Sequence, residues 1–346
     1  MEKNIKRKFM VKETHEIIEG IDNEGNRILN QYTVLSELGS GAFSKVKLVY
    51  DVTNNIYYAA KIIKKKELSL KKKNLKKDKS GKLIIDSYLK DAMRELAILK
   101  KIECPNIIQL REIIHEDIAD KIWLILDFAE RGTILDFDKD QNKYSINKYY
   151  LLDEDREEIY TEEEIKDFLR GIVIGLDYRK IYLNLVHSHK IVHRDIKPDN
   201  ILLDKNNNPK ITDFNVSAMM DRYKENKIDS VEGTMYFYAP ETCTDKNDSN
   251  FDAFPLDIWA LGVTTFCLTF LELPFHSPNN NFEELLDQIK NSEIVFPETR
   301  KISDDLSNLM RSMLIKDPDK RITIQGLINN KWLNEAREHL TLKVKK

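Results

Sequence analysis

The sequence is poor in cysteine, and its cysteines form no recognisable pattern. Only three occur in 346 residues, and Cys104, Cys243 and Cys267 are far apart along the chain. Their odd number and wide spacing argue against a disulfide framework and against a metal-binding cysteine motif. Both points favour a reducing compartment, so we expect a cytoplasmic protein.

Signals for secretion, lipid attachment and membrane insertion are also missing. The first residues lack the apolar core of a signal peptide, and Glu2 stands where N-myristoylation requires glycine. The longest apolar run, residues 258–271, is shorter than a membrane span and is flanked by Asp257 and Glu272. We therefore expect no membrane span, and the run is better interpreted as a buried helix.

A strong charge of one sign is absent too. The formal net charge is −3, whereas bulk nucleic-acid binding usually needs a strongly basic domain. Hydrophobic content of 41% and charged content of 33% are typical of a soluble globular protein. The length allows two domains with sizeable cores, and no internal repeat is visible.

The first part of the chain predicts a small antiparallel sheet. Residues 1–31 are polar and are expected to be loosely ordered or packed on a neighbour. Short turns then join alternating apolar stretches, which predict strands. The strands are expected over residues 32–38, 46–50, 57–63, 107–115 and 121–128.

Two further segments lie between the third and fourth of these strands. The basic run 64–82 is interpreted as a mobile, solvated loop, with a docking surface for an acidic partner as the alternative. Residues 86–101 have apolar side chains at three- and four-residue steps, which predicts a helix.

From Gly132 onward the sequence predicts a larger, mostly helical region. Residues 136–158 lack periodicity and are expected to be a surface insertion. Thr161 and Glu164 have the spacing of a capping box before an apolar helix. Later helices are expected over residues 256–271, 282–290, 303–314 and 323–329, with one more beginning at Lys331.

The most informative motif is H-R-D-x-x-x-x-N at residues 193–200, followed by Asp-Phe-Asn at residues 213–215. Phosphoryl transfer needs a carboxylate that orients a hydroxyl, and oxygen ligands that hold Mg²⁺. Asp195, Asn200 and Asp213 provide both kinds of group. The length of the motif argues against a chance match.

Two further features fit phosphate binding. A glycine-rich turn begins at Gly39 between two strands, where the backbone can approach phosphate oxygens. A dinucleotide-binding fold would need a helix after that turn, so the placement argues against one. Lys61 lies on the next strand and Glu95 on the predicted helix, and such a pair can hold the α- and β-phosphates.

Taken together, these motifs resemble those of eukaryotic protein kinases, over about residues 32–335. Residues 239–241 (Ala-Pro-Glu) and Arg321 match the pair that braces the activation segment in that family. Asp257 matches the buried acid that holds the catalytic-loop backbone. The resemblance implies an α+β, bilobal kinase fold, with a small antiparallel-sheet N-lobe carrying one main helix and a larger, mostly helical C-lobe. The implied parts are an N-terminal extension (1–31), an N-lobe (32–130), a C-lobe (131–335) and a basic tail (336–346).

The same resemblance implies transfer of the ATP γ-phosphate to protein serine or threonine, with ATP and Mg²⁺ as cofactors. Lys197 and Thr234 fit the Ser/Thr-specific pattern. The implied catalytic residues are Asp195 and Lys197, and the implied metal ligands are Asn200 and Asp213. The implied nucleotide-binding residues are Gly39, Ser40, Gly41, Ala42, Val46, Ala59, Lys61, Glu95, Asp127, Ala129 and Leu202.

Within the kinases, the chain is most similar to calcium/calmodulin-dependent protein kinase kinases. The similarity lies in residues 29–33, in the basic insertion after Lys61 and in residues 94–101. In that family the substrates are other kinases, phosphorylated on their activation loops. A generic kinase of the wider calmodulin-dependent group is the alternative.

Several departures from the family pattern leave other interpretations open. Asn215 replaces a glycine, and residues 179–185 are an insertion that is either a surface bulge or a gene-model artefact. These two features are the only support for a pseudokinase scaffold. The basic stretch 333–346 is short for a calmodulin target, which weighs against direct calmodulin regulation. Ser230 is the candidate site for a regulatory phosphate.

Overall fold

The protein is described here by a computed structural model, which divides the chain into two compact units, Met1–Phe128 and Ala129–Lys346. The structure describes residues 11–40, 44–66, 72–77, 83–87, 96, 100, 102–116, 120–138, 140–149, 158–183, 193, 195–213, 233–243, 253–277 and 281–334.

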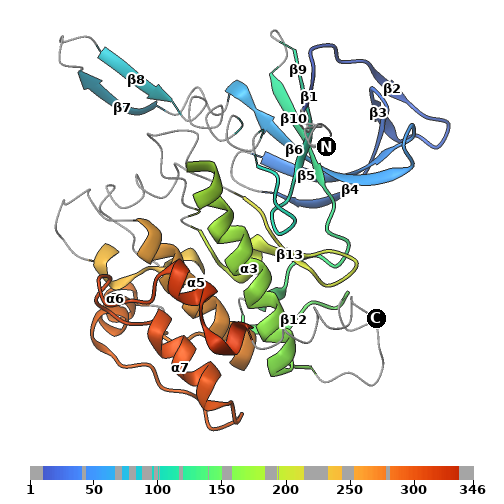
Figure 1. Cartoon of the computed structure of the whole chain (residues 1–346). Coiled ribbons are helices and arrows are strands. Elements are labelled where there is room, and N and C mark those ends of the chain that lie inside the picture. The colour runs from blue at the N-terminus through green and yellow to red at the C-terminus, as the bar shows by residue number, and fades with distance from the viewer. Residues whose placement is uncertain are drawn as a thin grey trace, which may run out of the picture. The chain divides into compact units, whose positions relative to one another are not determined.

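The first unit is built on an eight-stranded sheet with the order β1-β9-β10-β6-β5-β4-β3-β2 (Figure 1). The neighbouring strands are antiparallel except for β1 and β9, which are parallel. The strands are β1 (Lys12–Thr14), β2 (Glu19–Ile21), β3 (Arg27–Leu29), β4 (Tyr32–Ser40), β5 (Ser44–Asp51), β6 (Ile56–Lys64), β9 (Leu110–His115) and β10 (Lys121–Asp127). The five strands predicted from alternation are therefore present, and β4 is longer than expected.

One face of this sheet forms the core of the first unit. Successive side chains of a strand point to opposite faces, so Ala60 and Ile62 of β6 face Trp123 and Ile125 of β10 on the same side. All four side chains are buried in one apolar cluster. Burying a large apolar side chain contributes roughly 1.5–3 kcal/mol, so this cluster holds the central strands together.

The described part of the N-terminal extension, residues 11–30, is packed on the sheet. Its strand β1 lies along the edge strand β9, and Glu112 of β9 accepts hydrogen bonds from Thr14 Oγ1 (2.5 Å) and Tyr32 Oη (2.7 Å). Lys12 Nζ lies 2.9 Å from the same carboxylate. The sequence left two possibilities for this segment, a loosely ordered chain or one packed on a neighbour. The described residues are of the second kind, because they pair with the strands of the sheet.

The basic run after β6 differs from the expected mobile loop. Residues Lys72–Lys77 (β7) and Leu83–Ser87 (β8) form a two-stranded antiparallel hairpin. The Leu-Ile-Ile sequence at residues 83–85 favours a strand, and cross-strand pairing overrides the tendency of the lysines to form a solvated loop. The predicted helix does not begin at Asp86, because that residue belongs to β8. Leu96 is helical, whereas Glu95 lies outside the described residues.

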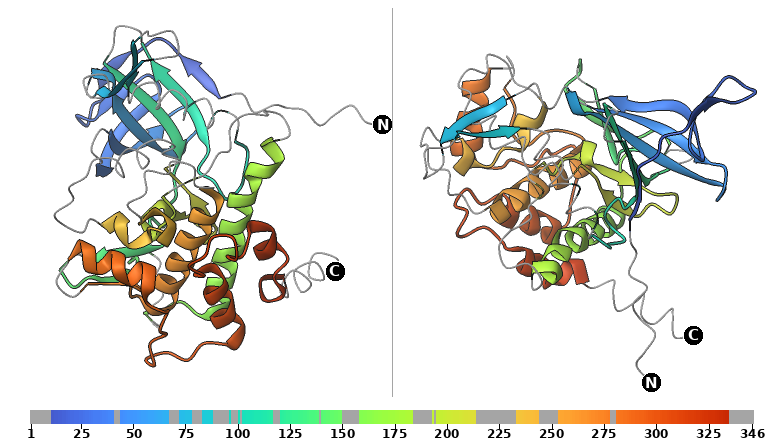
Figure 2. Two further views of the ribbon diagram at one scale, coloured as in Figure 1. Left: turned by 90° about the vertical axis from the view of Figure 1, so that its left-hand side faces the viewer. Right: turned by 90° about the horizontal axis from the view of Figure 1, so that it is seen from above.

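The second unit is mostly helical, with three short strand pairings. Its elements are β11 (Leu135–Asp138), β12 (Lys143–Ile146), α3 (Glu162–Leu183), η1 (Pro198–Asn200), β13 (Ile201–Leu203), β14 (Pro209–Ile211), η2 (Gly233–Phe237), η3 (Pro240–Thr242), α5 (Ala253–Phe270), α6 (Phe282–Asn291), α7 (Asp304–Met313) and α8 (Ile324–Ile328). Figure 2 shows α3 and α5 side by side within this unit. The apolar run 258–271 corresponds to α5, which is buried along most of its length. Among the described residues, no helix is both long enough and apolar enough to cross a membrane.

Helix α3 begins as the capping box predicts. The Thr161 amide donates to Glu164 Oε2 (2.8 Å), and the Glu164 amide donates to Thr161 Oγ1 (3.3 Å). The helix continues through Leu183, so the inserted residues 179–183 extend it rather than bulge out. Residues 184 and 185 lie outside the described part of the chain.

Residues 136–158 are not simply a surface insertion. The hairpin β11–β12 pairs Leu135 with Ile146, and both side chains are buried. The Tyr144 amide donates to the carbonyl of Leu271 at 2.9 Å, which anchors the hairpin just after α5. The mixture of acidic and aromatic residues hides this alternation in the sequence. Residues 150–157 lie outside the described part of the chain.

Candidate active site

The first unit places three of the predicted nucleotide-binding side chains on one sheet face. Ala59 and Lys61 are two residues apart in β6, so they share a face, and Val46 of β5 pairs directly with Lys61. All three are half-buried. They lie on the face opposite the apolar cluster of Ala60 and Ile62.

The glycine-rich segment begins inside a strand rather than in a turn. Gly39 and Ser40 are the last residues of β4 and pair with Val46 and Lys45 of β5. No described atom lies within 4 Å of a Cβ built on Gly39. Packing among the described residues does not require glycine there, and the open space suits close approach of a ligand. The next two predicted residues, 41 and 42, lie outside the described residues.

Asp127, the last residue of β10, has its side chain committed to local structure. Its carboxylate accepts from Arg111 Nε (2.5 Å) and Nη2 (2.8 Å), and its amide donates to the Gln109 carbonyl (3.0 Å). The hydrogen bonds from Arg111 to this carboxylate raise the pKa of the guanidinium above its ordinary value. A ligand contact at Asp127 would therefore use the backbone carbonyl rather than the side chain.

The second unit begins with a tight turn that carries Ala129. The Gly132 amide donates to the Ala129 carbonyl (3.2 Å), and φ of Gly132 is +71°, a conformation that favours glycine. The chain then pairs with β13, where Thr133 lies opposite Leu202. The turn that carries Ala129 is thus joined directly to β13, which carries Leu202. Both residues are predicted to contact the nucleotide.

Asp195, Lys197 and Asn200 converge within the 193–200 loop. Asn200 Nδ2 donates to both the carbonyl (2.7 Å) and Oδ2 (2.8 Å) of Asp195. Lys197 Nζ lies 3.2 Å from the same Oδ2. The other oxygen, Oδ1, is buried and has no hydrogen-bond partner among the described residues. Four other side-chain atoms of the described residues share that property.

His193 holds this loop in place from inside the protein. It is fully buried, and its amide donates to Asp257 Oδ2 at 2.9 Å. The Asp195 amide points at His193 Nδ1 (3.3 Å), so Nδ1 is the acceptor and Nε2 carries the proton that it donates to the Thr212 carbonyl (2.8 Å). The predicted role of Asp257, to hold the loop backbone, agrees with these contacts.

The residue after Thr212 is Asp213, and its backbone has an unusual conformation. The Thr212 amide donates to the Asn200 carbonyl at 3.0 Å, so both backbone groups of Thr212 are held by the loop. Asp213 has φ of +57°, in the left-handed region that costs energy for a residue with a side chain. The structure thereby brings the segment of Asp213 against Asn200. A carboxylate and an amide oxygen are hard ligands that fit Mg²⁺.

Comparison with known proteins identifies this arrangement. The sequence pattern of the protein kinase domain matches residues 32–333, which is most of the chain. The chain belongs to that family. The kinase has the bilobal architecture expected from its motifs, with an antiparallel-sheet unit followed by a mostly helical one.

The proteins similar to this kinase include several that are named serine/threonine kinases. The kinase is 34% identical over 329 residues to "Serine/threonine-protein kinase ssp1" of Schizosaccharomyces pombe, covering 93% of this chain and 45% of that protein. It is 31% identical to "Calcium/calmodulin-dependent protein kinase kinase" of Caenorhabditis elegans (88% and 53% covered). It is 30% identical to "SNF1-activating kinase 1" of Saccharomyces cerevisiae (96% and 30% covered). The chain thus spans about half, or less, of the length of these relatives. The family match and the names of the relatives show a kinase domain of the serine/threonine type.

A buried ion pair in the kinase matches the predicted brace. Arg321 Nη1 and Nη2 lie 2.7 and 2.9 Å from the two carboxylate oxygens of Glu241, and the guanidinium also donates to the carbonyls of Pro255, Ile315 and Lys316. Its side chain is fully buried. A bidentate pair with every other donor used fixes the segment at residues 239–241.

The motif by itself predicts no structural role for His193. The apolar residues beside it in the sequence are the one signal that its ring is buried. Asn215 and Ser230 lie outside the described residues of the kinase, as does the tail after residue 334. All three cysteines are buried and none is in a disulfide, and burial raises the pKa of Cys243 to about 12.

Proposed function

We propose that this chain is an active serine/threonine kinase that transfers the γ-phosphate of ATP to protein hydroxyls. The observation that carries the proposal is Asp195, whose Oδ2 is held by Asn200 and Lys197 while Oδ1 has no partner among the described residues. A buried carboxylate oxygen left without a donor is costly unless a ligand supplies one. A substrate hydroxyl is such a donor.

In this mechanism Asp195 accepts the proton of the serine or threonine hydroxyl as its oxygen bonds to the γ-phosphorus. The bond between the γ-phosphorus and the β–γ bridging oxygen breaks, and ADP leaves. Lys197 stabilises the charge of the transferred group, which is electrostatic positioning rather than covalent chemistry. Asn200 and Asp213 would hold Mg²⁺, which supplies positive charge to the phosphate oxygens when bound.

The first unit would provide most of the nucleotide contacts. Lys61 would hold the α- and β-phosphates and be positioned by Glu95, and the backbone at residues 39–42 would cover the phosphates. Val46, Ala59 and Leu202 would enclose the base, with the backbone of Asp127 and Ala129 along its edge. The proposed bounds, residues 32–130 for the N-lobe and residues 131–335 for the C-lobe, place the division two residues after Phe128, where the structure divides the chain.

The proposed substrates are the activation loops of downstream kinases. Support comes from the names of two relatives, a calcium/calmodulin-dependent protein kinase kinase and an SNF1-activating kinase. The alternative is a generic kinase of the calmodulin-dependent group. We place the reaction in the cytoplasm, in keeping with three cysteines that are all free.

The test is transfer of labelled phosphate from ATP to a peptide from a kinase activation loop. We expect transfer by the wild type and a loss of about 10²–10⁴-fold in kcat for Asp195→Asn, because the general base is removed. Asp199→Asn is the matched control, since this exposed acid lies in the same loop outside the proposed machinery. Nucleotide binding is measured in parallel for all three proteins.

Each outcome decides between the candidates. Nucleotide binding without transfer by the wild type would overturn the active kinase in favour of a pseudokinase scaffold. Equal rates on the activation-loop peptide and on a generic serine/threonine peptide would remove the kinase-kinase proposal and leave the generic one.

A further inference from the structure

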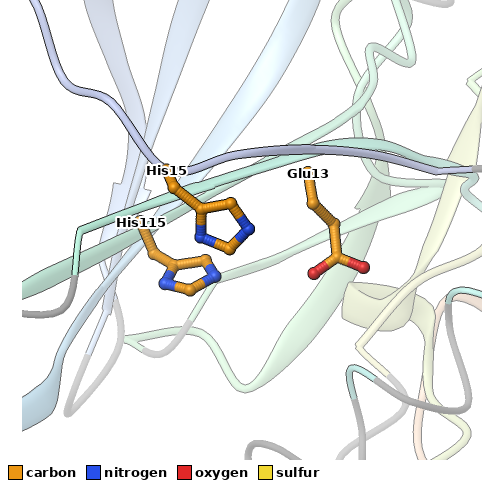
Figure 3. Close-up of side chains that lie close together, drawn as sticks. All are labelled: Glu13, His15 and His115. Carbon is orange, nitrogen blue, oxygen red and sulfur yellow. The ribbon is translucent and has the colours of Figure 1, made fainter.

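At one edge of the first unit, two histidines and a glutamate gather on neighbouring strands. Glu13 belongs to β1, His15 follows it, and His115 ends β9 (Figure 3). One ligand atom from each, a carboxylate oxygen or a ring nitrogen, lies within 4.8 Å of the other two. The two imidazole rings are in edge contact, with centroids 4.6 Å apart and planes at 80°.

Strand register explains why these three side chains meet. The parallel pairing sets Glu13 opposite Ile113 and Thr14 opposite Ile114. His15 and His115 are the next residues of the two segments, and their rings are in contact. Glu13 and His15 are two residues apart and therefore point to the same face. The intervening Thr14 points to the other face, where it donates to Glu112. The cluster is thus a consequence of backbone geometry.

We propose that Glu13, His15 and His115 form a binding site for a divalent transition-metal ion, with Zn²⁺ as the best-fitting example. Two imidazoles and one carboxylate are a common donor set for zinc, and a water molecule can complete a tetrahedron. Zinc–ligand distances of about 2.0–2.1 Å separate ligand atoms by roughly 3.3 Å. Closing the cluster from at most 4.8 Å needs only rotation of the side chains, two of which are exposed.

One neighbouring cation competes for the carboxylate. Lys100 Nζ lies 2.9 Å from Glu13 Oε1, and both side chains are partly exposed. A carboxylate has two oxygens, so Oε2 can ligate the metal while Oε1 keeps the lysine.

The consequence of binding is a cross-link between the N-terminal extension and the kinase sheet. Glu13 and His15 come from the extension, whereas His115 comes from β9. Strand register also places the cluster on the same sheet face as Lys61. Lys61 belongs to β6, and the order from there to Glu13 is β6, β10, β9 and β1. A ligand that binds only the paired strands stabilises their pairing by mass action. Metal binding would therefore hold β1 on the edge of the sheet that carries Lys61.

The test uses the full chain without a histidine tag, titrated with Zn²⁺ in excess Mg²⁺ so that oxygen-ligand sites are filled. We expect one bound Zn²⁺ by calorimetry, and slower amide hydrogen exchange at residues 12–15 when it is bound. Loss of a second-shell partner costs about 10–100-fold in metal affinity, so loss of a direct ligand in Glu13→Gln, His15→Ala or His115→Ala should weaken binding at least as much.

Two matched controls isolate the cluster. Glu16→Gln removes an exposed acid of the same segment, and His276→Ala removes an exposed histidine of the other unit. Both should bind Zn²⁺ as the wild type does. Titration with Co²⁺ gives an independent readout, because its visible absorption reports coordination by nitrogen and oxygen, and melting without metal shows that each variant is folded. Zn²⁺ binding that is absent in the wild type, or unchanged in all three ligand variants, would overturn the proposal.

Discussion

Two carboxylates, Glu112 at the β1–β9 edge and Asp195 in the catalytic loop, are treated very differently by the protein around them. Glu112 accepts from Thr14, Gln31 and Tyr32 and pairs with Lys12. Asp195 has Oδ2 held by neighbours, while Oδ1 is buried without a partner among the described residues.

The difference separates a structural carboxylate from one that we propose to be reactive. A buried acid with all its lone pairs used stabilises the elements that donate to it. An acid held on one oxygen and left open on the other is positioned without being satisfied, which destabilises the free protein and favours a hydroxyl ligand. The contacts themselves, rather than the residue type, carry this distinction.

The largest stability effect is expected at another satisfied carboxylate, Glu241. Arg321→Met should cost about 3–5 kcal/mol, because it leaves the nearly buried carboxylate of Glu241 without its cation. The free energy of unfolding in denaturant measures it. Arg321→Lys is the comparison variant, since it keeps the charge but loses the bidentate geometry. If Arg321→Met lowered the free energy of unfolding by less than 1 kcal/mol, the pairing of the Glu241 carboxylate with Arg321 would not stabilise the fold, and the comparison would fail.

A smaller effect is expected from Glu112 itself. Glu112→Ala should lower the free energy of unfolding by about 1–3 kcal/mol, since Tyr32 Oη and Thr14 Oγ1 lose their acceptor. Asp195→Asn should leave that free energy within about 1 kcal/mol of the wild type, because the unsatisfied oxygen contributes no stability. Denaturant unfolding of the two variants side by side measures both, and a reversed order would break the comparison.

The smallest expected effect is the loss, in acid, of the stability that Glu112 contributes. Burial alone would raise the pKa of Glu112, but the hydrogen bonds from Lys12, Thr14 and Tyr32 outweigh it and hold the pKa below its ordinary value. A carboxyl whose pKa is lower in the folded than in the unfolded protein stabilises the fold above the unfolded value and loses that contribution as pH falls through the folded one. The stability difference between wild type and Glu112→Gln should therefore be constant near neutral pH and shrink below about pH 4.5. A difference that grows in acid would mean the opposite sign of shift.

Local patterns predicted much of the fold and the loop chemistry. Alternation located five strands of the sheet, the spacing of Thr161 and Glu164 located the start of α3, and the 193–200 motif brought Asp195 and Asn200 together. These features depend on neighbours within a few residues, which the sequence states directly. The β7–β8 hairpin and the β11–β12 hairpin were missed, because charged and aromatic residues obscured their alternation and cross-strand pairing decided their structure.

By itself, the sequence determined the family and the type of reaction that this family catalyses, and it predicted which residues of the 193–200 loop would take part. Only the tertiary structure decided that the extension adds a parallel strand to β9 and that His15 meets His115. It also decided that both oxygens of Glu112 have partners, whereas Asp195 Oδ1 has none among the described residues. Thr14 and Glu112 are 98 positions apart in the chain, and Tyr32 and Glu112 are 80 apart. No local pattern records such pairings, because they depend on which strand edges the folded backbone brings side by side.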